Sequence, residues 1–180
     1  MTNHVEVELI RPRDVLLALV LVAFCLISPF ATGFGLLDAA LVVCAGAAPF
    51  TRRRWPWVTI ASCVVVLAAC SYTENLPTGV IGVAMITAYI IARHLPAPVR
   101  YVVATMLLAG DIAATALIAP ALVTLPLPVR APYIAWSVTL LVIAFLLGEL
   151  RHRAEEAAAK ELQIQLERQR DVFAVSYTHL

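Results

Sequence analysis

Residues 133–170 read YIAWSVTLLVIAFLLGELRHRAEEAAAKELQIQLERQR, and this stretch decides the fold. Its first part, Tyr133–Leu150, is almost entirely apolar, whereas residues 151–170 are rich in Arg, Glu, Lys and Gln. Strong helix formers predominate after Leu150, and no Gly or Pro follows there. The stretch from Val138 to Arg170 therefore predicts one continuous helix that passes from an apolar environment into water.

The rest of the chain extends the apolar pattern. Of its 180 residues, 62% are hydrophobic and only 14% are charged, so a soluble domain would have more apolar surface than one core could bury. A membrane-spanning helix needs about 20 mostly apolar residues. The sequence predicts an all-α, polytopic membrane protein with about six transmembrane helices and a C-terminal cytoplasmic helix. The predicted spans are Val15–Phe30, Gly35–Phe50, Trp57–Tyr72, Leu76–Ala92, Tyr101–Val123 and Tyr133–Leu150.

The breaks between these spans contain Pro and Gly, where a missing N–H costs little. Pro49 and Pro132 are both expected at or near turns. Pro120 is the exception, because it lies late in the fifth predicted span, and we expect it to kink that helix or end it early. The predicted domain boundaries are 1–14 for a cytoplasmic N-terminus, 15–150 for the transmembrane domain and 151–174 for the cytoplasmic helix.

The last six residues, 175–180, read Val-Ser-Tyr-Thr-His-Leu and depart from the charged helical pattern. This string is similar to one reading frame of a transposon end used in sequencing libraries. We therefore interpret residues 175–180 as a sequencing artefact and exclude His179 as a functional residue.

Positive charge alternates between the predicted turns. Lys and Arg collect in short cytoplasmic loops. Twelve of the 13 basic residues fall on one side of the six predicted spans, and Arg130 is the exception. Both termini are therefore predicted to be cytoplasmic. The residues on the basic side include Arg11 and Arg13, Arg52 to Arg54, Arg93 and Arg100, and Arg151 and Arg153.

The charged helix also carries a weak apolar seam. Residues with alternating spacings of three and four predict a dimerising coiled coil, although one of them is polar and one is small. The alternative is a solvated single helix. The seam consists of Ala159, Leu162, Leu166, Gln169 and Phe173.

Asp111 is the main candidate for a sensing or helix-packing residue. It lies near the middle of the fifth predicted span, where a carboxylate costs about 2.5–3.5 kcal/mol even on the lenient insertion scale. One interpretation is a switch that responds to protons or a ligand. The other is a hydrogen-bonded Asp that holds helices together through a residue such as Thr115 or Thr87. Gly110 and Ala114 beside it would allow close approach of a neighbouring helix.

Other polar residues receive structural interpretations. Asp38, Glu74, His94 and His152 are expected to be ordinary interfacial groups. The four cysteines are expected to be packing residues, because no CxxC pair suggests metal or redox chemistry. No catalytic set, phosphate loop, metal cluster or basic tract for nucleic acid is present in the sequence. The cysteines are Cys25, Cys44, Cys63 and Cys70.

A short charged N-terminus and six tightly connected spans, together with three more local features, resemble the N-terminal sensor region of actinobacterial-type sensor histidine kinases. The local features are the Arg-Arg-Arg-Trp-Pro turn at 52–56, the Ala-Tyr-Ile-Ile-Ala-Arg-His segment at 88–94, and the Glu/Arg/Ala-rich helix after the last span. The resemblance implies a membrane-embedded sensor module in the bacterial inner (plasma) membrane. It also implies a homodimer whose spans pass a rearrangement to the charged helix through the junction formed by Glu149, Arg151 and Arg153.

The same resemblance implies that the enzymatic chemistry lies elsewhere. A histidine box and an ATP-binding domain would follow in a missing C-terminal part, so ATP, Mg and the response regulator are expected to bind only there. This chain itself has no catalytic, cofactor or metal residues to assign. The alternatives are a small membrane transporter and a non-catalytic membrane scaffold.

Overall fold

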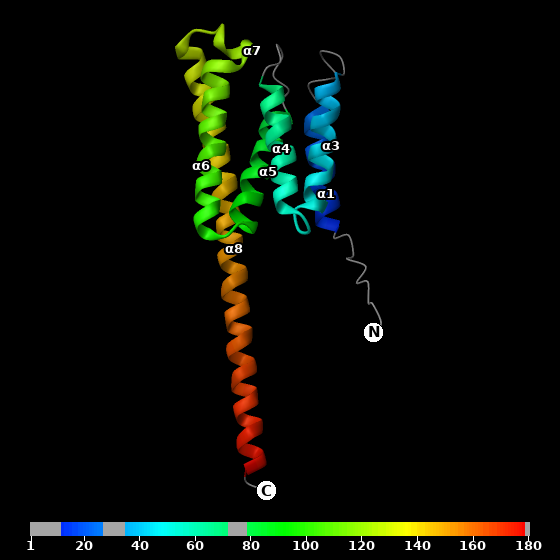
Figure 1. The fold of residues 1–180 in the computed structure, drawn as a ribbon, viewed down its shortest axis with the longest axis vertical. Helices are drawn as coiled ribbons and strands as arrows, with labels where there is room; N and C mark the ends of the chain where they lie inside the picture. Colours follow the sequence, from blue (N-terminus) through cyan, green and yellow to red (C-terminus); the bar gives the residue numbers. More distant parts are fainter. Residues whose placement is uncertain (1–11, 27–34, 72–78, 179–180) are drawn as a thin grey trace.

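The computed structural model describes the backbone of residues 12–26, 35–71 and 79–178, and the side chains of these residues except 121 and 171–178. This part of the chain is helical and contains no strand (Figure 1). Six of its helices have 15 residues or more. They are α1 (Pro12–Leu26), α3 (Leu36–Thr51), α4 (Pro56–Cys70), α5 (Gly79–His94), α6 (Ala97–Ala113) and α8 (Leu127–Thr178). A π-helical segment, η1 (Ala114–Ile118), and the short α7 (Pro120–Val123) connect α6 to α8.

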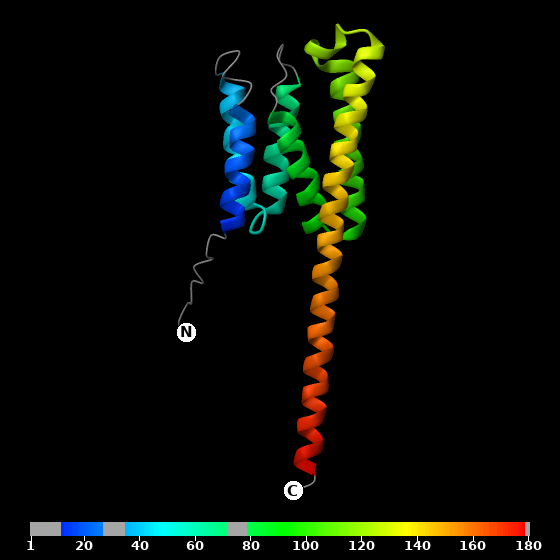
Figure 2. The same ribbon diagram turned by 180° about the vertical axis from the view of Figure 1, so that it is seen from behind.

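The long helices form a bundle in which successive helices run in opposite directions (Figure 1). We call the end where α5 finishes and α6 begins the tail end, and the end that holds α7 the far end. Helix α8 starts at the far end, crosses the bundle and extends far beyond the tail end, as the reverse view also shows (Figure 2). The predicted continuity of the helix from Val138 to Arg170 is therefore confirmed.

Helix α5 is the centre of the bundle. It contacts α1, α3, α4, α6 and α8, and its most extensive contact is with α8. Val83, Ile90 and Ile91 on α5 are almost fully buried in the main apolar core. Cys25, Cys63 and Cys70 are buried in the same core and Cys44 is packed against it, as expected of packing residues.

The fifth predicted span ends earlier than Val123. Helix α6 gives way to η1 at Ala114, and Ala119 is extended because the residue before a proline avoids the helical region. Pro120 then occupies the first turn of α7. Its missing N–H cannot bond to the carbonyl of Ala116, and Nη1 of Arg130 donates to that carbonyl instead, at 3.0 Å. The expectation that Pro120 ends the helix early is confirmed.

Two other prolines correct the predicted boundaries. Pro132 lies inside α8, which begins at Leu127 and not at Tyr133. Pro49 lies inside the last turn of α3 and not in a turn. Both sit close to a helix end, where losing one backbone hydrogen bond interrupts little of the ladder. Helix α8 also continues to Thr178 without ending at Ala174, where the sequence pattern changes. That residues 175–180 are an artefact stays a prediction.

Within the described residues, two segments are long and apolar enough to cross a membrane, namely Ala97–Ile118 and Leu127–Arg170. Three shorter helices, α3, α4 and α5, are also apolar. Large apolar side chains are exposed along the outer surface of the bundle, including Leu16, Val43, Val65 and Met106, each more than 60% exposed. Membrane association is thus indicated by two helices, and the six-span arrangement is treated below as a proposal.

Candidate functional site

The predicted junction at Glu149 lies where α8 leaves the bundle. The Glu149 carboxylate forms an ion pair with Arg100 of α6, with 3.1 Å between Oε2 and Nη1, and both side chains are 8% exposed. Its Oε1 accepts a hydrogen bond from Nε of Arg153, one turn further along α8, at 2.9 Å. This hydrogen bond, followed by the negative charge of Glu149, raises the pKa of Arg153. Glu149 therefore connects the start of α6 to the start of the tail.

Arg151 belongs to a separate ion-pair group. Its Nε lies 3.2 Å from Oε1 of Glu155, and the same oxygen lies 2.6 Å from Nη2 of Arg93 at the end of α5. The structure therefore brings Glu149 and Arg153 together but places Arg151 with Glu155 and Arg93. Both groups tie the beginning of the tail to the tail end of the bundle.

The contact between α8 and α5 is unusually close beside Glu149. A Cβ atom added to Gly148 would lie 2.7 Å from the carbonyl oxygen of Tyr89 and 2.8 Å from Cβ of Ala92. Real Cβ atoms essentially never approach a backbone atom so closely, so only glycine fits here without a shift of α5. Ala84, Ala88, Leu141 and Ala144 continue this apolar interface toward the far end.

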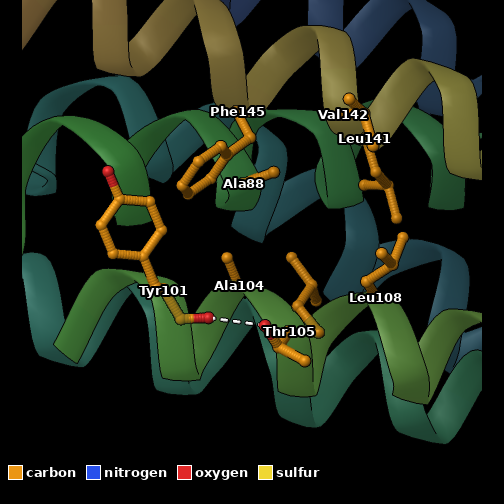
Figure 3. Close-up of a pocket in the computed structure, with 9 residues that line it drawn as sticks. Ala88, Tyr101, Ala104, Thr105, Leu108, Leu141, Val142 and Phe145 are labelled. Carbon is orange, nitrogen blue, oxygen red and sulfur yellow. Dashed lines mark hydrogen bonds between the residues drawn. The ribbon is translucent and has the colours of Figure 1, made fainter. Parts of the chain in front are cut away.

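Helices α8 and α6 pack less closely than α8 and α5 do. A cavity of about 160 Å³ lies between these helices, with α5 at its base (Figure 3). Tyr101, Ala104, Thr105 and Leu108 of α6 line one side of it, and Leu141, Val142 and Phe145 of α8 line the other. The rings of Tyr101 and Phe145 are 6.0 Å apart and tilted, so they close only the tail end of this space.

At the far end, Asp111 forms a further polar contact between α6 and α8. The hydroxyl group of Ser137 donates a hydrogen bond to Oδ2 of Asp111. The partners expected from the sequence are not used, because Thr115 donates to the backbone carbonyl of Asp111 at 2.7 Å and Thr87 donates to the carbonyl of Val83 at 2.7 Å. Asp111 also lies in the last turn of α6, two residues before its end, and not at mid-helix.

Asp111 borders a second, mostly apolar cavity of about 460 Å³ between α4, α5, α6 and η1. Gly110 lines this cavity, and a Cβ atom added to it would meet nothing within 4 Å. No other helix of the described chain therefore makes the expected close approach at Gly110. The small residues leave space beside the carboxyl group, and whether Asp111 senses anything stays a prediction.

The predicted coiled-coil seam is exposed in the single chain. Leu162 and Leu166 are 59% and 53% exposed. Ile164, outside the predicted seam, is 49% exposed. Ala159 and Gln169 are also exposed, and the side chain of Phe173 lies outside the described residues. An apolar seam on an otherwise charged helix is compatible with both interpretations given above, and dimerisation stays a prediction.

The remaining candidates have local roles. Asp38 accepts a hydrogen bond from the N–H of Gly35 at 2.9 Å and so caps the start of α3. His152 lies 3.0 Å from Glu156 on the same helix, and His94 is half-buried at the end of α5. Glu74 lies outside the described residues. Among the residues that the structure describes, no group of three or more His, Cys, Asp or Glu could hold a metal ion.

Sequence reasoning missed the partners of the predicted residues. Arg93, Arg100 and Glu155 form the two ion-pair groups together with the predicted junction, and Ser137 binds Asp111. The charges of Arg93, Arg100 and Glu155 and their positions near span ends could be read from the sequence, whereas Ser137 is uncharged. The helix rotations that bring these residues together could not be read from it.

Comparison with known proteins assigns no family: no family model matches the sequence, and neither a curated protein nor a solved structure is significantly similar to it.

Proposed function

We propose that this chain is the membrane-embedded sensor module of a two-component histidine kinase, with six spans and both termini in the cytoplasm. The module passes a rearrangement of its helices through α8 to a kinase part, which binds ATP, Mg and the response regulator. The chain acts as a homodimer through its tail. The proposal starts from the resemblance of residues 52–56, 88–94 and the charged tail to such kinases.

A membrane location is supported by the outer surface of the bundle. The exposed apolar side chains would be costly in water, at about 25 cal/mol for each Å² of apolar surface. Trp55, Trp57 and Tyr101 are exposed at the tail end and Trp136 near the far end, as is typical of residues at membrane interfaces. Among the described residues, Arg130 is the one Lys or Arg at the far end. This asymmetry favours a cytoplasmic tail end.

Four of the proposed spans are short. Helices α1, α3, α4 and α5 have 15 or 16 described residues. At 1.5 Å per residue such a helix covers about 24 Å, whereas the hydrocarbon core is about 30 Å thick. Flanking residues or local thinning of the bilayer supply the difference.

The observation that carries the signalling proposal is the continuity of α8. One helix of 52 residues packs against α5 within the bundle and then forms the exposed charged tail. A rotation or translation of its bundled part must reach the tail, because the helix has no break at Glu149 to absorb it. The Arg100–Glu149 ion pair lets α6 act on α8 at this boundary.

The test uses the complete kinase. Insertion of one Ala after Arg153 rotates all following residues by about 100° relative to the bundle, so the kinase output should change sharply. Insertion of seven residues after Arg153 is the matched control, because two helical turns nearly restore the original orientation. Unchanged output after the single insertion would rule out this route.

The topology is tested separately with reporter fusions at residue 1 and near residue 170. Both should report a cytoplasmic location, and reporters on opposite sides would contradict the six-span arrangement. Genomic sequence beyond Ala174 distinguishes the alternatives, since a histidine box and ATP-binding motifs support the kinase. An early stop would favour a transporter or a scaffold.

A further inference from the structure

The tail end of the bundle contains a cavity that shares Arg93 and Arg151 with the ion-pair group at the start of the tail. Its volume is about 510 Å³, and it lies among α1, α3, α5 and the start of the tail. Five arginines line it, namely Arg13 of α1, Arg52 and Arg53 in the turn after α3, Arg93 of α5 and Arg151 of the tail. We call it the arginine cavity.

The positive charge of the arginine cavity is only partly neutralised. Among the lining residues Asp14 is the one carboxylate, and it is shared by Arg52 at 2.7 Å and Arg53 at 3.1 Å. Glu155, just outside, is likewise shared by Arg93 and Arg151. Two carboxylates are thus shared by four of the five guanidinium groups, and Arg13 forms no ion pair among the described residues, so the cavity attracts an anion.

Hydrogen-bond donors in the arginine cavity are also left without acceptors. The Arg52 side chain is 7% exposed, and its Nε is buried without a hydrogen-bond partner among the described residues. Nε of Arg93 is buried in the same way. A buried donor without an acceptor is costly, and a charged donor is more so. These two Nε atoms are themselves enclosed, so an anion in the cavity would be bound by the more exposed guanidinium groups of the lining, such as Arg53 and Arg151, which are 26% and 56% exposed.

Phosphate is the anion that best matches this arrangement. The planar guanidinium group donates two parallel N–H groups to phosphate oxygens, and several arginines can surround one phosphate. The cavity is larger than a single phosphate requires. Basic pockets between transmembrane helices at the cytoplasmic surface bind the head groups of anionic lipids. Tyr89, which accepts a hydrogen bond from Arg93 at 3.3 Å, adds a hydroxyl group to the lining.

We propose that the arginine cavity binds a phosphate group, and that this phosphate belongs to the head group of an anionic phospholipid. The phosphate site stands on the cavity itself, whereas the lipid source rests on the proposed membrane arrangement. The bound head group joins α1 and α3 to α5 and α8. The site therefore connects the N-terminal helices to the signalling helix. The ion pairs of the lining residues otherwise join α1 to the turn after α3, through Asp14, and α5 to α8, through Glu155.

The experiment is a binding titration of the purified, delipidated full chain in a non-ionic detergent, read by native mass spectrometry. The probes are phosphatidylglycerol, phosphatidylcholine and inorganic phosphate. We expect phosphatidylglycerol to be retained preferentially and inorganic phosphate to compete with it. Arg53→Gln and Arg93→Gln should each weaken phosphatidylglycerol binding about tenfold, because each removes a charged donor.

Arg54→Gln is the matched control. Arg54 lies in the same turn and carries the same charge, but it stacks on Trp55 and does not line the cavity. Its substitution should change binding less than about twofold. Asp14→Asn should have the opposite effect on affinity. It removes the carboxylate that competes with the anion, so phosphatidylglycerol should bind more tightly. Helix content and thermal midpoint of each variant are measured to confirm folding.

The outcomes separate the two parts of the proposal. Binding of inorganic phosphate without phosphatidylglycerol would retain the phosphate site and overturn the lipid source. Equal retention of phosphatidylcholine and phosphatidylglycerol would overturn the preference for an anionic lipid, because both head groups carry a phosphate. Equal weakening by Arg54→Gln and Arg53→Gln would overturn the site. If topology reporters contradict the six-span arrangement while phosphate binding remains sensitive to Arg53 and Arg93, the proposed function fails and the phosphate site stands.

Discussion

Helix α8 meets its two neighbours in different ways. Against α5 the contact is extensive and apolar, and at Gly148 the two backbones approach so closely that a methyl group has no room. Against α6 the contact is sparse, and polar contacts lie on either side of a cavity of about 160 Å³. Arg100 and Tyr101 contact Glu149 at the tail end, and Asp111 contacts Ser137 at the far end.

The difference indicates which helix can move. A tightly interdigitated apolar interface resists sliding, because any shift opens voids or creates clashes. A cavity bounded by polar contacts at both ends has room for side chains to rearrange. We therefore expect α5 and α8 to behave as one rigid unit and α6 to shift relative to it.

The largest effect is expected at the tail-end contact with α6. Glu149→Gln removes the charge that compensates Arg100, which is 8% exposed, so unfolding in mixed micelles should become about 3 kcal/mol more favourable. The control is Arg151→Gln, because Arg151 and its partner Glu155 are 56% and 44% exposed and such pairs contribute about 0–1 kcal/mol. Equal effects of the two substitutions would show that burial does not matter here.

The next effect tests the tight contact with α5. Gly148→Ala should destabilise the bundle by about 1–3 kcal/mol in the same assay, because the added methyl group meets the backbone of Tyr89. Gly110→Ala is the matched control on α6 and should stabilise by about 0.5–1 kcal/mol, since it adds helix propensity and meets nothing within 4 Å. If Gly148→Ala were also stabilising, α8 and α5 would not be closely packed.

The smallest effect is expected at the far-end contact. Ser137→Ala removes the hydrogen bond to Asp111 and should cost about 1 kcal/mol. Thr139→Ala is the control, because the Thr139 hydroxyl donates to the carbonyl of Ala135 on its own helix and joins no other. Hydrogen exchange at α6 should increase in Ser137→Ala but not in Thr139→Ala. The same increase in both variants would contradict an interhelical role for Ser137.

The sequence by itself determined the elements that depend on local chemistry. Apolar runs predict the helices, the helix formers after Leu150 predict the tail, and the missing N–H of Pro120 predicts the early end of α6. The concentration of arginines at one end of the bundle could also be predicted from the sequence, because the charge of each loop is counted residue by residue. Pro132 misled the prediction, since a proline near a helix start is tolerated within the helix.

Only the tertiary structure decided which side chains meet. Glycine appears at both 110 and 148 in apolar helices, yet one borders a cavity and the other fits against a backbone. The carboxyl group of Asp111 accepts a hydrogen bond from Ser137, 26 residues away, and not from Thr115, which is nearer in the sequence. The physical reason is that pairings depend on the rotation of each helix about its axis. That rotation is set by the packing of all neighbours together and not by any one segment of the chain.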